Sequence, residues 1–166
     1  MIDFLIGKDY LCSKITKTCM NYHKYQLRAE RNLTTFEFVS VGKKGNIRKI
    51  ILYRETNLKG VFNLGFGDKN EITGDIDDLI KTDNGDSEMV LATVASTIYA
   101  FYTKFPDASI YVVGSTASRT RLYQIGIAKN IVEISDDFYV YGQINEEDWE
   151  DFTENKNYLA FLIQKK

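Results

Sequence analysis

The run Ser109-Ile110-Tyr111-Val112-Val113 constrains the fold of this chain most strongly, because it is apolar on both faces of an extended segment. A strand of this kind is expected at the centre of a sheet. The run lies between two segments of helical pattern, one that ends before Pro106 and one that follows Gly114. The sequence therefore predicts a mixed sheet packed against helices.

The segment from Ser87 to Phe105 carries the clearest helical pattern. Apolar residues recur every three or four positions, as they do along a buried helical stripe, and small residues occupy other positions, which permits close approach to a sheet. The predicted stripe consists of Leu91, Val94, Ala95, Ile98, Tyr102 and Phe105. The preceding Asp83-Asn84-Gly85-Asp86 is typical of a turn and a helix N-cap. A second helix is predicted from about Thr116 to Lys129.

Strands are predicted on both sides of these helices. A strand at 36–41, the glycine hairpin loop Gly42–Asn46 and a second strand from Ile47 to Tyr53 form a hairpin, and Val61 to Phe66, closed by Gly67-Asp68, continues it as an antiparallel meander. The remaining predictions are a short edge element at 75–81, strands at 131–134 and 138–141, an acidic loop or helix at 145–157 and an apolar segment at 158–163. The fold class is thus α+β, a meander followed by helix, strand, helix and strand, which is also the element order of an RNase H-like fold.

A chain of 166 residues with a single proline is expected to form one domain over residues 1–166. It divides into a basic N-terminal segment (1–32), a core (33–142) and an acidic C-terminal extension that ends in an apolar segment (143–166). No apolar run approaches the length of a membrane span, and the first residues lack a secretory pattern. A cytoplasmic protein without a membrane partner is expected.

The near-neutral net charge conceals an asymmetry. Residues 1–60 hold twelve Lys and Arg against five Asp and Glu, whereas residues 61–166 hold nine against eighteen. Such a separation is typical of a face for nucleic acid or for an acidic partner, and equally of basic and acidic segments that lie beside one another inside the fold.

The stretch Gly114-Ser115-Thr116-Ala117-Ser118-Arg119-Thr120-Arg121-Leu122-Tyr123 is the main candidate site. A strand, a glycine, hydroxyl side chains and a helix with arginines together present backbone N–H groups and positive charge to an anion. The predicted ligand-binding residues are Ser115, Thr116, Arg119, Thr120 and Tyr123. On a regular helix Thr116, Arg119, Thr120 and Tyr123 share an arc of about 100°, whereas Arg121 points about 160° away from Arg119.

An arginine in the first helical turn is unfavourable for the helix dipole, so a partner for Arg119 is expected. Two explanations fit: a bound phosphate or carboxylate, or an internal acid such as Asp68, Asp83 or Asp86. We therefore expect Asp68, Asp86 and Arg121 to lie around the site without being its main ligand-binding residues.

Other chemistries find less support. No P-loop is present, because Gly114-Ser115-Thr116 lacks the Gly-Lys-Ser/Thr that should follow. Two-metal nuclease chemistry in an RNase H-like fold needs a carboxylate at the end of the strand at 109–113. The sequence has carboxylates near other predicted strand ends but none there. Cys12, Cys19 and His23 fit no common zinc pattern. No metal or cofactor is expected, and a catalytic role is assigned to no residue.

Four further patterns stand out in the sequence: Asn63–Asp68, Asn84-Gly85-Asp86, Val90–Val94 and the Gly-Ser-Thr-x-x-Arg-Thr-Arg-Leu-Tyr signature at 114–123. Together they resemble a family of small uncharacterised bacterial proteins, classed as a domain of unknown function. The resemblance covers residues 22–142 and implies a short bacterial protein, with no catalytic roles to transfer.

The leading hypothesis from the sequence is a non-enzymatic domain that binds the phosphate of a nucleotide or nucleic acid, with the tyrosine-rich basic N-terminal segment extending the contact. A second hypothesis is a protein–protein module of a small bacterial gene pair, in which the acidic tail around Trp149 and the basic start dock partners. A third is a phosphoester-acting enzyme that uses Arg119 or Arg121 to stabilise charge and Asp68 or Asp86 as acid–base groups.

Overall fold

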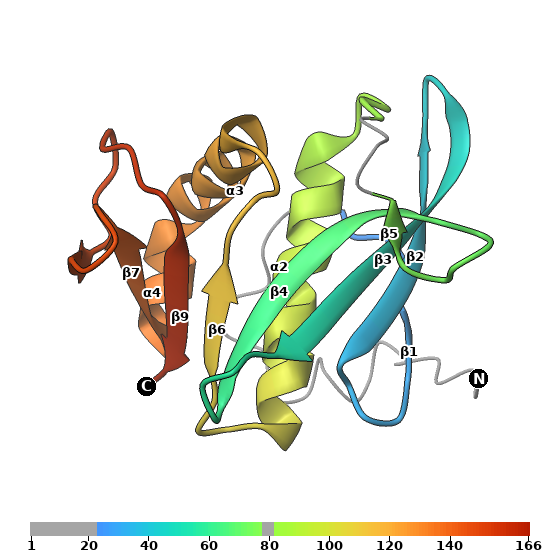
Figure 1. Cartoon of the computed structure of the whole chain (residues 1–166). Coiled ribbons are helices and arrows are strands. Elements are labelled where there is room, and N and C mark those ends of the chain that lie inside the picture. The colour runs from blue at the N-terminus through green and yellow to red at the C-terminus, as the bar shows by residue number, and fades with distance from the viewer. Residues whose placement is uncertain (1–22, 78–81) are drawn as a thin grey trace. The chain divides into compact units, whose positions relative to one another are not determined.

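The computed structural model of the chain describes residues 23–77 and 82–166 (Figure 1). Over these residues it contains three helices and a mixed, mostly antiparallel sheet of nine strands, which confirms the α+β prediction. The strands are β1 (Arg28–Ala29), β2 (Thr35–Gly42), β3 (Gly45–Glu55), β4 (Val61–Lys69), β5 (Ile76–Asp77), β6 (Ser109–Val112), β7 (Phe138–Gln143), β8 (Trp149–Asp151) and β9 (Phe161–Lys165). The helices are α2 (Ser87–Lys104), α3 (Ala117–Lys129) and α4 (Ile131–Asp137).

The chain divides into two compact units. Among the described residues the first unit comprises 23–52 and 66–104, and the second comprises 53–65 and 105–166. Strands β3 and β4 each contribute residues to both units. The division of residues 1–166 into a basic segment, a core and an acidic extension stays a prediction.

The first unit is built on the predicted hairpin. Strands β2 and β3 pair antiparallel from Thr35 opposite Leu52 to Gly42 opposite Gly45, so only two lysines form the turn. Gly45 has a φ of +90°, a conformation that glycine adopts without the steric cost other residues have. Strand β1 pairs with β2, and β5 pairs with β4 as the edge element expected from the sequence. The hairpin prediction is confirmed.

Helix α2 confirms the predicted helix but buries a different face. Val94 and Tyr102 of the predicted stripe are buried, whereas its members Leu91, Ala95 and Ile98 are only partly buried. The fully buried residues are instead Thr93, Thr97 and Phe101. Threonine tolerates this position because its hydroxyl donates to a carbonyl of the preceding helical turn, as it does from Thr93 to Met89 at 2.7 Å.

In the second unit the strands follow the order β4-β6-β9-β7-β8. Strand β6 pairs parallel with β4 and antiparallel with β9, which confirms that the apolar run at 109–112 lies inside a sheet. Strand β9 lies between β6 and β7, so the apolar end of the chain forms an interior strand (Figure 1). This placement could not be predicted, because an interior position depends on partners far along the chain.

Three local predictions are wrong. Residues 131–134 belong to helix α4, where the Ile134 N–H donates to the Asn130 carbonyl at 2.9 Å, although a short apolar run fits a strand equally well. Gly67 and Asp68 continue β4 rather than close it, because β5 pairs with the strand at this point. The acidic segment 145–157 contains strand β8, which pairs with β7.

No helix within the described residues is long and apolar enough to cross a membrane. The likeness of the element order to an RNase H-like fold stays a prediction.

Candidate functional site

The candidate site is the turn between β6 and α3 in the second unit. The Gly114 N–H donates to the Thr120 hydroxyl at 3.0 Å, which ties the end of the strand to the first turn of the helix. A Cβ atom at Gly114 would lie 2.4 Å from the Thr120 backbone nitrogen and 2.6 Å from the Arg119 Cβ. The glycine is therefore required by close approach of the backbone, as in anion-binding turns.

Thr116 caps helix α3. Its backbone is extended, with φ −141° and ψ 156°, and its hydroxyl accepts a hydrogen bond from the Arg119 N–H at 3.3 Å. The hydroxyls of Thr116 and Ser118 lie 3.1 Å apart, and both residues are exposed. The first turn of α3 contains no acidic residue, so no carboxylate there offsets the positive end of the helix dipole.

Arg119 turns back toward the start of its own helix. Its Nη1 atom donates to the Ser115 hydroxyl at 2.9 Å, on an exposed part of the turn. This hydrogen bond keeps a guanidinium beside exposed hydroxyls and the N-terminal end of α3. The turn thus gathers the groups that bind an oxyanion: helix N–H groups, hydroxyls and a positive charge.

The five predicted ligand residues divide into two groups. Ser115, Thr116 and Arg119 lie at the surface of the turn, whereas Thr120 and Tyr123 are buried, with 6% and 7% of their area exposed. The Thr120 hydroxyl is engaged by Gly114 and also donates to the Thr116 carbonyl at 3.4 Å.

Arg121 is exposed. The 3.6-residue repeat of the helix predicts that its side chain points away from that of Arg119.

Asp68 and Asp86 belong to the first unit, where each is held by its own partners. Asp68 accepts from the Lys49 ammonium and the Thr82 hydroxyl, in a buried pair. Asp86 Oδ2 accepts from the hydroxyls of Tyr25 and Ser40, both at 2.6 Å. These two carboxylates therefore form hydrogen bonds and an ion pair inside the first unit.

The Asp86 cluster also joins the loop before α2 to the hairpin. Asn84 donates from its amide to the Ser40 hydroxyl at 2.9 Å and accepts from the Lys44 N–H at 2.7 Å. Burial, and then the hydrogen bond to the Asp86 carboxylate, raise the pKa of Tyr25. The sequence predicts a helix cap at 83–86, which includes Asp86. It does not predict the cluster, because the members of the cluster come from four separate segments.

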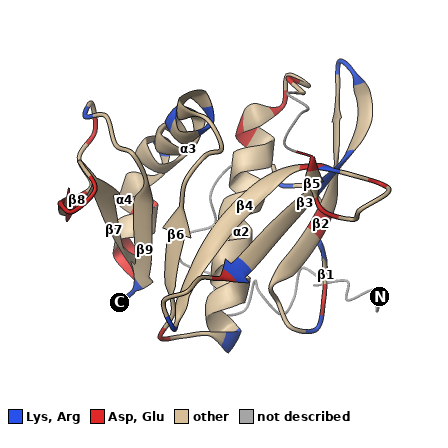
Figure 2. Cartoon of the chain, viewed as in Figure 1, with Lys and Arg blue, Asp and Glu red and all other residues tan. Residues whose placement is uncertain are grey.

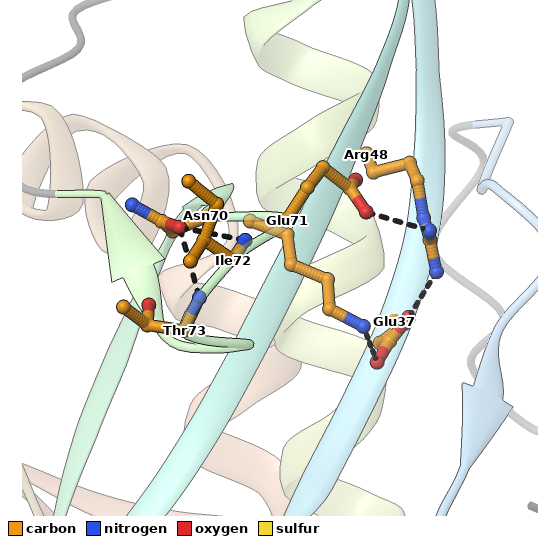
Figure 3. Close-up of polar contacts among 7 residues, drawn as sticks. Glu37, Arg48, Asn70, Glu71, Ile72 and Thr73 are labelled. Carbon is orange, nitrogen blue, oxygen red and sulfur yellow. Dashed lines mark hydrogen bonds and ion pairs between the residues drawn. The ribbon is translucent and has the colours of Figure 1, made fainter.

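A partly buried ion-pair network crosses β2, β3 and β4. The Glu37 carboxylate accepts from Lys69 at 2.6 Å and from Arg48 at 3.1 Å, and Arg48 also donates to Glu71 at 2.9 Å (Figure 3). In the turn that follows, Asn70 Oδ1 accepts from the backbone N–H groups of Ile72 and Thr73 (Figure 3). The charges of this network neutralise one another, so it is a structural feature and not a candidate anion site.

Within residues 23–77 and 82–166, no group of three or more His, Cys, Asp or Glu side chains is arranged to hold a metal ion. His23 is exposed. Cys12 and Cys19, together with most of the predicted basic N-terminal segment, lie outside the described residues.

The fold and the turn together define a small α+β protein with a glycine-hydroxyl-arginine turn after an interior strand. The chain belongs to a family of unknown function, DUF6934, whose model matches residues 21–166. The match therefore includes the C-terminal strands β8 and β9, which the sequence resemblance over 22–142 left out. No curated protein and no solved structure matches the chain.

Proposed function

We propose that this protein is a non-enzymatic binding domain that takes the phosphate of a nucleotide or nucleic acid at the turn between β6 and α3. Ser115, Thr116 and Arg119 contact the anion. Thr120 and Tyr123 support the turn from the interior, since both are buried.

The observation that carries the proposal is the hydrogen bond from Arg119 to Ser115 at 2.9 Å. It holds a cation near the N-terminal end of a helix, where a positive charge costs about 0.3–1 kcal/mol. An oxyanion between the guanidinium and the first-turn N–H groups would offset this cost and gain charge-assisted hydrogen bonds. The first turn of α3 carries no acidic residue of its own, and the N-terminal end of a helix favours an anion.

A phosphoester-acting enzyme receives less support. General acid–base chemistry needs a carboxylate within hydrogen-bond reach of the reacting group. Asp68 and Asp86, the two acids assigned to that role from the sequence, are occupied by Lys49 with Thr82 and by Tyr25 with Ser40.

The test compares Arg119→Ala with Arg121→Ala, which removes the same charge from the exposed side of the same helix. Binding of inorganic phosphate, of nucleoside triphosphates and of a single-stranded oligonucleotide is measured over a series of salt concentrations. Loss of a charge-assisted hydrogen bond of about 1.5–3 kcal/mol predicts a tenfold or greater weakening in Arg119→Ala and little change in Arg121→Ala. Equal affinity in the two variants, or no binding of any probe by the wild-type protein, would overturn the proposal.

A further inference from the structure

The sheet of the second unit has one buried face and one open face. Alternate residues point to opposite faces of a strand, and the buried face carries the apolar core of this unit. Its buried strand residues are Phe62, Leu64, Ile110, Val112, Phe138, Val140, Phe161 and Ile163. The paired residues between them form a transverse row on the other face, in the order Asn63, Tyr111, Leu162, Tyr141 and Asp151.

Aromatic side chains gather on this open face. The rings of Tyr111 and Trp149 meet edge to face with their centroids 6.2 Å apart, and those of Tyr139 and Tyr141 stack at 6.4 Å. Half of the area of Tyr139 and 37% of that of Trp149 remain exposed. Aromatic rings left at the surface of a sheet are typical of binding faces.

The edge of this face is acidic. Residues 144–155 hold six Asp and Glu and no Lys or Arg, and Figure 2 shows the acidic colouring of β8. Asp151 pairs with Tyr141 and so lies on the open face, while Glu146 and Glu147 are exposed in the loop before β8. Glu150 pairs with Gly142 and faces the other way, where Lys156 neutralises it at 2.7 Å.

One further contact indicates what this face binds. The Lys166 ammonium already lies 5.2 Å from the centroid of the Tyr139 ring, which is a cation–π geometry. A cation over an aromatic ring favours a ligand that brings positive N–H groups.

We propose that the open face of β6, β9, β7 and β8 docks a segment of a protein partner that is rich in Lys and Arg. The guanidinium or ammonium groups lie over the rings of Tyr139 and Trp149, and Asp151 with the loop acids Glu146 and Glu147 neutralises their charge. A nucleic acid could stack on the same rings, but its phosphates would be repelled by the acidic edge, whereas single-strand platforms carry a basic groove.

Trp149 reports directly on the proposed contact, because it is the only tryptophan of the chain. The experiment titrates the full-length protein with a short peptide of alternating Arg and Gly while following tryptophan emission. Two negatively charged probes are used for comparison: a peptide of alternating Glu and Gly, and a single-stranded oligonucleotide. The proposal predicts that only the cationic peptide shifts the emission, with an affinity that falls as salt is added.

The variants are Asp151→Asn and Tyr139→Ala, with Asp107→Asn as the control that removes the same charge from an exposed turn of this unit. Each of the first two should weaken peptide binding about threefold or more, and Asp107→Asn should not. Circular dichroism verifies that each variant is folded. The proposal fails if the cationic peptide leaves the emission unchanged, if Asp151→Asn and Asp107→Asn bind equally, or if the oligonucleotide alone shifts the emission.

Discussion

The Tyr25 hydroxyl donates a hydrogen bond of 2.6 Å to Asp86 Oδ2, across 61 residues of sequence. The same hydroxyl lies 3.0 Å from the Val41 N–H, from which it accepts. The Tyr25 ring stacks on Phe38 at 5.4 Å between centroids. A single side chain therefore fastens the segment before β1 to both strand β2 and the start of α2.

Replacement of Tyr25 by phenylalanine should destabilise the protein. The ring contact with Phe38 survives, but Asp86 loses one of its two hydroxyl donors. A hydrogen bond to a charged group contributes about 1.5–3 kcal/mol, so a loss of this order in the free energy of unfolding is expected from urea denaturation. Tyr139→Phe, which removes a hydroxyl from a half-exposed ring, should change it by less than about 0.5 kcal/mol. Equal effects of the two variants would contradict this role.

The stability of the protein should fall in alkaline solution. Burial raises the pKa of Tyr102 and of Tyr111 above the ordinary tyrosine value of 10.0, and burial with the Asp86 carboxylate raises that of Tyr25. Above pH 10 the unfolded chain loses these protons first, so it binds fewer protons than the folded chain. The stabilisation is thus complete below pH 10 and is lost as pH rises toward the folded pKa values.

The measurement is urea denaturation over a series from about pH 8 to pH 11. Each tyrosine with a raised pKa contributes a slope of up to about 1.4 kcal/mol per pH unit above pH 10. Tyr102→Phe removes one of them, so the decline should become shallower than in the wild-type protein. An identical slope in both proteins would show that this phenol does not titrate differently on folding.

The buried pair of Lys49 and Asp68 should be among the most sensitive positions in the first unit. Only 7% of the area of each residue is exposed. Lys49→Met leaves a buried carboxylate without its cation, which costs about 3–5 kcal/mol in the free energy of unfolding. Lys49→Met combined with Asp68→Leu should recover most of this loss, because no buried charge remains.

A matched control for that pair is Lys156→Met, which breaks the exposed pair with Glu150. Its effect on thermal or urea unfolding should be small, since exposed ion pairs contribute little. If Lys49→Met proved as mild as Lys156→Met, the buried pair would have no special role in stability.

The Thr120 hydroxyl should matter for the shape of the turn. Thr120→Val keeps the volume but removes the acceptor of the Gly114 N–H, so unfolding should become easier by about 1–3 kcal/mol. Thr120→Ser retains the acceptor and should restore most of the hydrogen bond's contribution. A thermal melt of the two variants separates this role from a contact with ligand, and equal melting temperatures would contradict it.

Local patterns predicted many individual elements correctly. The hairpin of β2 and β3 follows from alternating strand residues around glycines that permit a tight turn, and α2 and α3 follow from helical spacing with Pro106 and Thr116 at their boundaries. The Gly114 turn was singled out for the same reason, because its backbone geometry depends on neighbours within ten residues.

Burial within each helix followed less closely from the sequence. Thr93 and Thr97 are fully buried although threonine is polar, because their hydroxyls bond to carbonyls of their own helix. Thr120 and Tyr123 share the arc of Arg119 on a helical projection, yet the fold buries them. A projection gives the direction of a side chain but not what packs against it.

By itself the sequence determined the α+β class, the hairpin, the two long helices and the position of the glycine turn that follows β6. Tertiary structure alone decided that the last strand lies between β6 and β7, that Asp68 and Asp86 are committed to partners in the first unit, and that aromatic rings and acids share one open sheet face. The physical reason is the distance along the sequence between the residues that interact. Turns and helices depend on nearby residues, whereas strand order and side-chain partners depend on segments brought together only when the chain folds.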